Sequence, residues 1–536
     1  MQFPIFRYNS YAMGKKIIEI GKVDYPYTCA IVNNQIMGLL DEVEEVKNIE
    51  YLSVKEGEGR RTYERSIAFL ATVALKKISK NSRLNIMHSI GEALYGEIEN
   101  SDETLIDRLK DEFFKLIRDD KIINKYSLTK EVAIRKLEQE GRYGDIQTIE
   151  FLAKEVLSLY ELDGIYLYFA GPLVPFTHML KVVDIIRVNS GIFFLLPDKH
   201  NPMVVSRLPK YDKLLEAFNE GKRWADLLGV KTVGDLNKSI VNGKISNIIK
   251  IQEALHEKKI SEIAQTVREK NALVILIAGP SSSGKTTFAK KLEIHLRVLN
   301  LKPHIISIDN YFVDREKTPL NESGNPDYDT LEAVDYKLLQ IHLNNLLKGE
   351  EVETPKYNFI TGKREKGKKI KIENNGPIII EGIHALNPVL TRDVRDEVKY
   401  KIYVSALSQV NIDNINRIPT RDTRLIRRIV RDAHFRGISA QENLRRWKDV
   451  IDAEEKYVFP YQENAHIMFN SALIYELAIL RNFAEVPLRA IEYKEKEYAE
   501  ALRLLNFLYH ILPLQQDEVP PTSILREFIG KSSFKY

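Results

Sequence analysis

A glycine-rich stretch that ends in a lysine is the strongest chemical signal in the sequence. Residues 279–286 read Gly-Pro-Ser-Ser-Ser-Gly-Lys-Thr and match the pattern G-x-x-x-x-G-K-[ST]. Gly279 and Gly284 let the backbone turn tightly, so that successive N–H groups point inward at phosphate oxygens. Lys285 can then reach the outer phosphates, and the Thr286 hydroxyl can ligate Mg²⁺. The pattern therefore predicts a site for a nucleoside triphosphate.

Two acidic residues at the ends of apolar runs are candidates for the chemistry beside the phosphates. Asp309 follows the run His304–Ile308, and Glu381 follows Pro377–Ile380. If these runs are parallel strands, their carboxyl ends open onto the crevice where ligands bind. Asp309 could then accept a proton from an attacking hydroxyl and approach Mg²⁺, with Glu381 as a second carboxylate near the metal. The alternative for Asp309 is a helix cap or a solvated loop residue.

Arginines gather in one short segment further along the chain. They are Arg417, Arg421, Arg424, Arg427, Arg428 and Arg431. On a helix the last four share one face, because their spacing is i, i+3, i+4 and i+7. Such a face could close over the phosphates as a lid, neutralise charge on the transferring group and exclude water. The alternatives are a solvated basic face or an RNA-binding stripe, although few aromatic residues interleave the cluster.

From residue 272 onward, short apolar runs alternate with amphipathic segments of helix length. The expected strands are Leu273–Ala278, His304–Ile308, Pro377–Ile380, Lys401–Val404, Ile467–Phe469 and Leu488–Ile491. A helix is expected after the glycine-rich loop, with an apolar stripe of Phe288, Ala289, Leu292, Leu296 and Leu299, and another over Tyr498–Ile511. This alternation predicts an α/β fold whose mainly parallel sheet carries helices on both faces.

Three regions with other patterns precede residue 272. Residues 1–58 predict a small β-rich unit around the turn Asn33-Asn34, residues 59–205 an α+β domain, and residues 206–271 a charged helical connector to 272–536. The segments behind these predictions are the strands Lys16–Ile20, Thr28–Val32, Ile165–Phe169 and Ile192–Leu196, and the helices Ser66–Ile78, Ile245–Leu255 and Ile260–Arg268.

Length and composition exclude several classes of protein. The chain of 536 residues is too long for one small module, and 44% hydrophobic with 29% charged residues is typical of ordinary globular domains. The 79 basic and 75 acidic residues leave a net charge of +4, too small an excess for a nucleic-acid wrap or a membrane surface. Cys29 is the only cysteine, so no disulfide can form within the chain. Without a leader-like or membrane-spanning run, we expect a cytoplasmic protein with no membrane partner.

Taken together, the motifs resemble the uridine kinase and phosphoribulokinase family of P-loop kinases over about Ala272–Glu492. The similar segments are the phosphate loop Gly279–Thr287, the catalytic-aspartate segment Ile308–Phe312, the acidic acceptor loop Asn325–Asp329, the nucleobase hairpin Thr354–Phe359, the acidic strand end Glu381–Ile383 and the arginine lid Arg421–Asp432. The resemblance implies that ATP and Mg²⁺ bind here. It also implies that the γ-phosphoryl group moves to a hydroxyl of a nucleoside or a similar small polyol.

The resemblance also implies roles for individual residues. Those expected to act in catalysis are Asp309, Lys285, Arg424, Arg427 and Arg428. Those expected to hold the nucleotide are Gly279, Ser281, Ser282, Ser283, Gly284, Lys285, Thr286, Thr287 and Arg431. Those expected to bind the acceptor are Asp309, Tyr311, Asp327, Asp329, Tyr357, Phe359 and Arg424, with either Asp327 or Asp329 on the sugar hydroxyls. The expected metal ligands are Thr286, Asp309 and Glu381.

One departure from the family pattern concerns the acceptor. In pyrimidine nucleoside kinases the hairpin carries a histidine near the base, whereas this chain has Gly362, followed by a basic run from Lys363 to Lys371. An anionic acceptor would suit that charge, so a sugar or sugar-phosphate kinase of the phosphoribulokinase type stays open as an alternative.

The N-terminal half resembles part of threonyl-tRNA synthetases, as in a longer bacterial type of nucleoside kinase. Lys16–Lys55 looks like the ubiquitin-like TGS domain, and Arg65–Leu70 with Gly171–Thr177 is similar to the editing-type α+β domain. The resemblance implies modules kept for binding or assembly. An RNA-binding regulatory ATPase is the alternative from another functional class, although acids and bases are interspersed over residues 1–271. Oligomer formation stays open.

The zinc ligands of that synthetase domain are not present at the matching positions. Arg65 and Phe69 replace its His-x-x-x-His pair, and the downstream cysteine position falls near Phe169, while His178 remains. Neither Arg65 nor Phe69 can offer a neutral imidazole to a metal. We therefore expect a degenerate module without zinc or editing chemistry.

Overall fold

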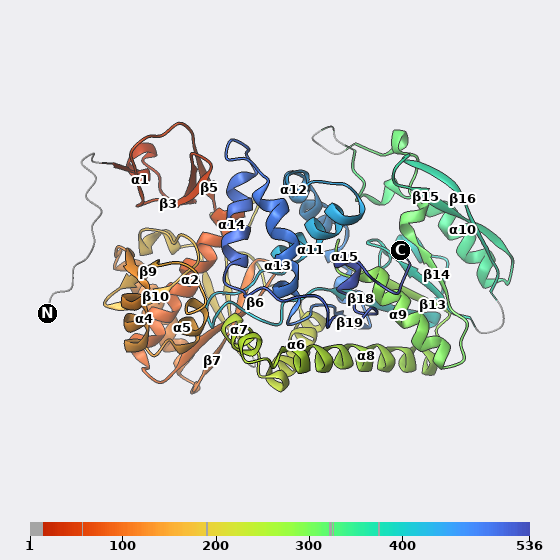
Figure 1. Ribbon diagram of the computed structural model, residues 1–536, viewed down its shortest axis with the longest axis horizontal. Coiled ribbons are helices and arrows are strands. Elements are labelled where there is room, and N and C mark those ends of the chain that lie inside the picture. Colours follow the sequence, from red (N-terminus) through yellow and green to blue (C-terminus); the bar gives the residue numbers. More distant parts are fainter. Residues whose placement is uncertain are drawn as a thin grey trace.

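The computed structural model describes residues 14–55, 57–188, 191–208, 210–320, 324, 326–372 and 376–535. In Figure 1 the N-terminal half lies at the left and the C-terminal half at the right, and the long helix α8 (Ile245–Glu269) runs along the lower edge of the right half. Within these described ranges, no helix combines the length and the apolar character needed to cross a bilayer.

A five-stranded parallel sheet forms the centre of the C-terminal half. In spatial order its strands are β14 (His304–Ser307), β17 (Ile378–Glu381), β13 (Val274–Ala278), β18 (Lys399–Ser405) and β19 (Ile467–Asn470). All five were predicted as strands to within two residues at either end. After the central strand β13, the chain forms β14 and β17 on one side of it and then β18 and β19 on the other. This change of direction makes a topological switch point at β13. Open sheets of this kind bind ligands beyond the carboxyl ends of such strands.

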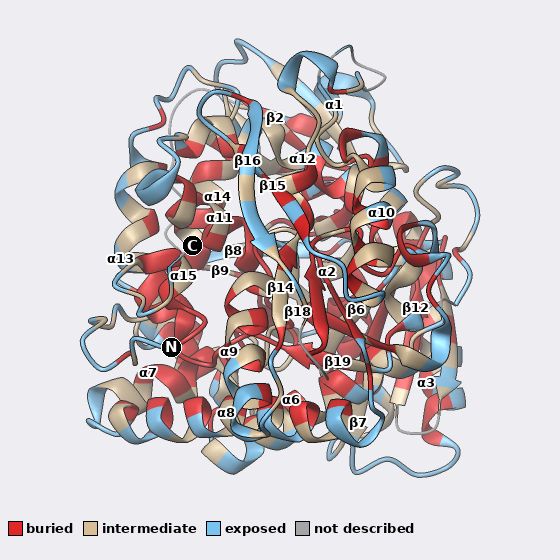
Figure 2. Cartoon of the chain, turned by 90° about the vertical axis from the view of Figure 1, so that its right-hand side faces the viewer, coloured by how far each residue is buried: buried red, intermediate tan, exposed pale blue. Residues whose placement is uncertain are grey.

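The sheet is covered on both faces because successive side chains of each strand point to opposite sides. In β13, Ile275 and Ile277 belong to one hydrophobic core, whereas Val274 and Leu276 belong to another. Helices of the first core are α8, α9 (Lys285–Val298), α11 (Thr420–Phe435), α13 (Glu476–Arg489) and α14 (Tyr498–Leu508), and those of the second are α6 (Asp212–Leu228) and α10 (Tyr336–Leu347). In Figure 2 the central strands are buried between these layers, while the hairpin strand β16 (Lys363–Ile370) is largely exposed.

The strand predicted at Leu488–Ile491 is wrong. Residues 476–489 form helix α13, which ends just after Leu488. Leu477, Ala484 and Leu488 recur at helical spacing and are buried in the first core. A short apolar run cannot by itself distinguish a helix end from a strand.

The N-terminal half contains four small sheets in which all described pairings are antiparallel. Their strands are β1 (Lys15–Lys16) with β4 (Glu42–Val43); β3 (Gln35–Gly38), β2 (Tyr27–Val32) and β5 (Ile49–Ser53); β11 (Asp184–Val188), β12 (Gly191–Leu195), β7 (Ala93–Glu99) and β6 (Arg83–Ile90); and β10 (Ile165–Tyr168), β9 (Val156–Leu162) and β8 (Asn124–Thr129). Its helices are α1 (Ile17–Gly21), α2 (Gly57–Ile78), α3 (Leu105–Arg118), α4 (Lys130–Gln139) and α5 (Tyr143–Ile149).

Two predictions for the first β-rich unit had different outcomes. Asn33 and Asn34 both have positive φ angles, 49° and 59°, and join β2 to β3 in a tight hairpin, as their residue types predicted. The strand expected over Lys16–Ile20 is instead mostly helix α1, which buries Ile17 against the unit's core. Residues 1–13 and Glu56, which belong to the predicted domain 1–58, lie outside the described residues.

At the positions of the synthetase zinc ligands, the structure has a packed apolar contact. The rings of Phe69 and Phe169 meet edge to face, 6.1 Å between centroids. Arg65 forms an ion pair with Glu58, and the half-buried His178 contacts Asp120. The division of the N-terminal half into synthetase-like domains stays a prediction.

Three helices make up the predicted connector and join the C-terminal core. Helices α6, α7 (Val233–Val241) and α8 are confirmed, and the two helical segments expected within 245–268 are one continuous helix. Glu257 of α8 accepts a hydrogen bond from Lys291 of α9 at 2.6 Å and lies 2.8 Å from Nε2 of His295. The connector therefore packs directly against the helix that follows the phosphate loop.

A buried network of charges joins helix α2 of the N-terminal half to helices α11 and α14. Glu58 accepts a hydrogen bond from Nε of Arg61 at 2.6 Å, and Arg61 in turn pairs with Glu500 of α14 at 2.9 Å. Arg503 of α14 makes a bidentate contact with Asp422 of α11, at 2.8 and 2.9 Å. Helix α11, which carries the arginine cluster, is thus tied at its start to the N-terminal half.

Candidate active site

The phosphate loop between β13 and α9 has the backbone geometry that its glycines predicted. A Cβ atom on Gly279 would lie 2.0 Å from the carbonyl oxygen of Val404 in the neighbouring strand, so no larger residue fits there. Gly284 caps helix α9 with a φ of 83°, and Ser282 also has a positive φ of 58°. These left-handed positions bend the loop around a space that the first amides of α9 face, which is a geometry suited to an anion.

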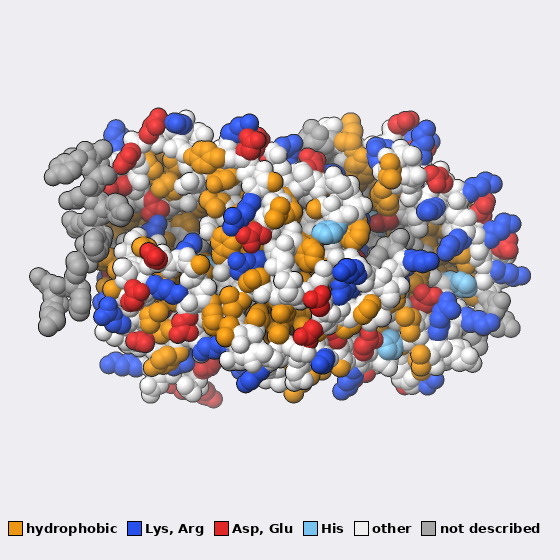
Figure 3. All heavy atoms as spheres, in the orientation of Figure 1, with side chains coloured by type: hydrophobic (Ala, Val, Ile, Leu, Met, Phe, Trp, Pro, Cys, Tyr) orange, Lys and Arg blue, Asp and Glu red, His pale blue; other side chains and the backbone are white. Residues whose placement is uncertain are grey.

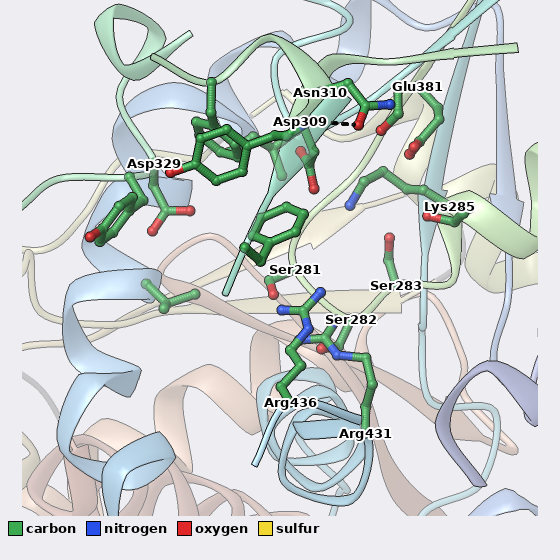
Figure 4. A pocket seen from close by; sticks show the side chains of 18 of the residues that line it. Ser281, Ser282, Ser283, Lys285, Asp309, Asn310, Asp329, Glu381, Arg431 and Arg436 are labelled. Atoms are coloured by element: carbon green, nitrogen blue, oxygen red, sulfur yellow. Dashed lines mark hydrogen bonds between the residues drawn. The ribbon is translucent and has the colours of Figure 1, made fainter. Parts of the chain in front are cut away.

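Lys285 extends from the first turn of α9 into the space between the loop and the acidic strand ends (Figure 4). Its Nζ donates a hydrogen bond to the carbonyl oxygen of Pro280 at 3.0 Å. Burial lowers the pKa of Lys285, and the negative charges of Glu381 and Asp309 partly offset this effect. The lysine therefore sits where it can contact both the carboxylates and a phosphate chain.

The two predicted acids come together at the carboxyl ends of adjacent strands. Ser307 of β14 pairs with Glu381 of β17, and Asp309 follows in the short turn Ile308–Tyr311. Burial and the nearby charge of Asp309 together raise the pKa of Glu381 to about 7, against the opposing effects of Ser307 and Lys285. Two neighbouring carboxylates, with Glu381 buried and its pKa raised, are a natural place for a cation.

These residues fit a magnesium ion that is shared with the substrate. Among the described residues, no three His, Cys, Asp or Glu side chains gather into a ligand set of their own. Mg²⁺ is usually held by one or two carboxylates together with phosphate oxygens and water, rather than by a complete protein cage. Asp309, Glu381 and the Thr286 hydroxyl could supply the protein ligands, and all three line the same cleft.

Arg424 and Arg427 do not have the lid positions predicted for them. Arg424 is 1% exposed and Arg427 is fully buried. Nε of Arg424 donates to the carbonyl oxygen of Ser281 at 2.9 Å, and its guanidinium pairs with Glu454 of helix α12 (Ala440–Tyr457). Both guanidinium groups are thus committed to holding the phosphate loop from behind. Neither side chain lines the cleft in this structure, and the catalytic roles predicted for both, with the acceptor contact predicted for Arg424, stay predictions.

Arg427 is held from several sides. It donates to the carbonyl oxygen of Ser471 at 2.9 Å, to the Ser471 hydroxyl at 3.2 Å and to the carbonyl oxygen of Ser282 at 3.4 Å. It also forms an ion pair with Glu476, which is itself buried. Because Ser282 lies in the phosphate loop, Arg427 fixes the loop to helix α13.

Arg428 and Arg431 of helix α11, and Arg436 directly after it, do line the cleft. Arg428 donates to the Ser281 hydroxyl at 3.0 Å, and burial together with the charge of Arg431 lowers the pKa of Arg428 to about 10. Arg431 and Arg436 point toward the phosphate-loop serines from the side opposite Asp309 (Figure 4). Arg436 was not predicted, because it lies outside the i, i+3, i+4 spacing of the cluster.

The acceptor side is built from the acidic loop and from aromatic rings. Phe312, Tyr357 and Phe359 form a cluster with centroid distances of 5.1 to 6.4 Å, and Arg436 lies 5.9 Å from the Phe359 ring. Tyr357 belongs to β15 (Val352–Asn358), whose backbone is joined to the Asp309 turn by a 3.3 Å hydrogen bond from the Tyr357 N–H to Asn310 (dashed in Figure 4). Phe312 was missed as a site residue although it lies in the catalytic-aspartate segment.

The two candidate aspartates of the acceptor loop, Asp327 and Asp329, have different surroundings. One carboxylate oxygen of Asp327 accepts hydrogen bonds from the backbone N–H groups of Asp329 and Thr330, both at 3.1 Å. Burial raises the pKa of Asp329 to about 6, opposed by Arg428 and reinforced by neighbouring acids. Asn325, at the start of this predicted loop, lies outside the described residues.

Tyr311 does not reach the acceptor as predicted. Its ring is fully buried, and its hydroxyl is 3.0 Å from Nδ1 of His342 in helix α10. The short turn that exposes Asp309 rotates the tyrosine into the core behind the sheet. Its neighbours Asn310 and Phe312 line the cleft instead.

The phosphate loop, the two acids and the aromatic cluster line a single cleft of about 2530 Å³. It runs from the phosphate loop past Asp309 and the aromatic cluster to the β15–β16 hairpin. Lys and Arg side chains gather at the right-hand end of Figure 3, the end at which Figure 1 places this hairpin. The cleft is large enough for a nucleotide and a second molecule together, since typical ligand sites measure roughly 300–1,000 Å³.

Comparison with known proteins finds similarity over the C-terminal half. The profile of the Phosphoribulokinase / Uridine kinase family matches residues 274–476. A uridine kinase of Halobacterium salinarum is 29% identical over 198 residues, which cover 37% of this chain and 79% of that protein. A uridine kinase of Mycoplasma pneumoniae is 32% identical over 182 residues, covering 34% of this chain and 76% of that protein. A solved structure titled as a possible uridine kinase from Bacillus stearothermophilus aligns with 40% of this chain and 98% of its own, at 22% identity and a TM-score of 0.27.

The phosphate loop, its lysine and the paired carboxylates define the C-terminal half as an ATP-dependent kinase. The chain belongs to the phosphoribulokinase and uridine kinase family, through a region that begins at β13 and ends in helix α13.

Proposed function

We propose that the protein transfers the γ-phosphoryl group of ATP to a hydroxyl of a nucleoside or a similar small polyol. The observation that carries this proposal is the meeting of Lys285, Asp309 and Glu381 in one cleft with the aromatic cluster of Phe312, Tyr357 and Phe359. The first group suits phosphoryl transfer, and the second suits a planar base, because aromatic rings stack on nucleobases.

The chain's own residues supply the steps of this reaction. The acceptor oxygen forms a bond to the γ-phosphorus while the bond to the β–γ bridging oxygen breaks, and ADP leaves. Asp309 accepts the proton of the attacking hydroxyl, and Lys285 binds the phosphate oxygens. Arg428 and Arg431 neutralise charge on the transferring group from the opposite wall. Thr286, Asp309 and Glu381 would hold Mg²⁺, which would supply further neutralisation of the phosphate charge.

Asp329 is the better candidate of the two loop aspartates for the acceptor's hydroxyls. The Asp327 carboxylate is already used by two backbone N–H groups of its own loop. Asp329 faces the same cleft as Arg428 and Asp309, whose charges affect its pKa. This leaves its oxygens available to accept hydrogen bonds from a sugar.

A specific observation favours a second acceptor class, a sugar or sugar phosphate. Gly362, at the position of the family's base-contacting histidine, lies against Arg315: an added Cβ would be 2.7 Å from the Arg315 Nε. Arg315 lines the cleft together with Lys356, Lys368 and Lys369 of the hairpin. A guanidinium and several ammonium groups there would suit an anionic acceptor.

ADP release assayed against a panel of nucleosides, sugars and sugar phosphates would test the proposal. We expect at least one nucleoside to raise ADP release well above the rate with ATP alone, and Asp309→Asn to abolish that rise. Stimulation by sugar phosphates alone would favour the second class, and Arg315→Gln should then raise KM for that acceptor. No stimulation by any compound would contradict both.

The N-terminal half has a supporting role in this proposal. We infer that residues 14–205 form synthetase-like modules kept for binding or assembly, as the sequence resemblance implies. The ion pairs of Arg61 with Glu500, and of Arg417 with Glu64 of helix α2, give these modules a firm attachment to the kinase region. Full-length protein is therefore the right material for the acceptor assay.

A further inference from the structure

The chain segment Val519–Gly530, here called the tail segment, packs against the phosphate loop from outside the region matched by the family. Its apolar side chains Val519, Ile524, Leu525, Phe528 and Ile529 are all buried. Ile524 lies so close to Gly284 that an added Cβ there would be 2.6 Å from its Cγ2. The carbonyl oxygen of Thr522 accepts a hydrogen bond from Lys291 of α9 at 3.2 Å. The tail segment is thus anchored beside the first turns of the phosphate-loop helix.

One carboxylate of the tail segment lies on the anion-binding end of that helix. An oxygen of Glu527 accepts hydrogen bonds from the backbone N–H of Thr287 at 3.2 Å and from its hydroxyl at 2.5 Å. The first amides of a helix have no acceptor within the helix, and in a phosphate loop they are the groups that bind phosphate oxygens. Glu527 therefore takes up a donor that a nucleotide would use, and its carboxylate lines the same cleft as Lys285.

The position of Glu527 conflicts with a bound phosphate chain. A carboxylate and a phosphate oxygen cannot both accept the same N–H, and two anions at this separation repel each other. The contact also differs from that of Glu454, which accepts the Ser281 N–H at 2.7 Å but is paired with the buried Arg424. Glu454 belongs to a fixed support of the loop, whereas Glu527 reaches it from a separate segment.

We propose that the tail segment is an intrasteric plug, in which Glu527 mimics a phosphate and must leave Thr287 before a nucleotide binds fully. This inference rests on the proposed function, because it concerns the nucleotide site of that reaction. The plug lowers the affinity of the resting enzyme for nucleotide. It also keeps the phosphate-binding amides satisfied while the site is empty.

Calorimetric titration of the full-length protein with ADP, without any acceptor, tests the plug directly. Glu527→Gln keeps the size of the side chain but removes the charge, and it should bind ADP about ten-fold more tightly than the unchanged protein. Glu518→Gln is the matched control, because Glu518 is an exposed carboxylate just before the tail segment. The control should leave ADP affinity unchanged.

Further measurements distinguish a failure of the plug from a failure of the proposed function. Circular dichroism confirms folding of each variant before titration. Equal or weaker ADP binding by folded Glu527→Gln would overturn the plug while leaving the kinase assignment intact. If the folded, unchanged protein and all variants fail to bind ADP, the proposed function itself is overturned, and the plug with it.

Discussion

Replacing Arg427 by methionine should destabilise the protein severely, although the sequence pattern places this residue in a lid over the phosphates. The guanidinium is fully buried and binds Glu476, Ser471 and Ser282. Methionine has a similar length, so much of the packing is kept while the charge is lost. Burial already raises the pKa of Glu476 against the opposing charge of Arg427. Removing one partner of such a buried pair costs about 3–5 kcal/mol.

Urea unfolding at neutral pH measures this loss, with Arg431→Met as the matched control on the same helix. Arg431 faces the cleft, and its partner Asp432 retains contacts with Arg428 at 3.6 Å and Arg436 at 3.7 Å. We expect the control to lose about 1 kcal/mol or less of unfolding free energy but to be slower in phosphoryl transfer. Adding Glu476→Gln to Arg427→Met should restore part of the lost stability. A loss below about 1 kcal/mol for Arg427→Met would refute the structural role assigned to it.

Three further predictions concern the loop, the acid and the junction between the two halves. Gly279→Ala should lose ADP binding in titrations and about 1–3 kcal/mol of stability, because its Cβ would collide with the Val404 carbonyl; normal ADP affinity would contradict this. Asp309→Asn should retain ADP binding but lower turnover ~100-fold or more in a coupled assay of ADP release, and normal turnover would remove Asp309 from the mechanism. The folded-state pKa of Glu58 is lowered to about 2, although burial opposes this, because Arg65 and nearby arginines stabilise its charge. Glu58 thus contributes stability that is present above about pH 4.5 and lost as the pH falls toward 2, so the stability difference from Glu58→Gln should shrink on acidification in urea unfolding; a constant difference would contradict it.

The parts of the site that follow from local sequence could be predicted, and those that depend on distant partners could not. The loop 279–286 and the strand ends at Asp309 and Glu381 are set by short patterns with a fixed geometry. Helical spacing correctly places Arg424, Arg427, Arg428 and Arg431 within one helix, but it cannot tell which of them is buried. Burial was decided by Glu454 and Glu476, which lie 30 and 49 residues beyond the arginines that they bind.

The contact made by Glu527 shows the same limit more strongly. It lies 240 residues from Thr287, and neither its type nor its spacing suggests a place in the phosphate loop. The prediction for Tyr311 failed for another reason. Tyr311 and Asp309 lie in one turn of four residues, and within this turn their side chains point in different directions. Hydrophobic periodicity shows only which face of a helix or strand is apolar. It therefore predicts neither the geometry of short turns nor contacts between distant residues.

Helix α8 is needed in any fragment of this enzyme that is to fold on its own. Ile260, Ile263 and Val267 share one core with Leu292 of the phosphate-loop helix. A fragment that starts at residue 272, where the family resemblance starts, would lack α8. It would expose a hydrophobic surface along the phosphate-loop helix and would be prone to aggregate. Expression of the catalytic half by itself should therefore begin ahead of α6, so that the protein's own helices, rather than a neighbouring molecule, cover the back of the nucleotide site.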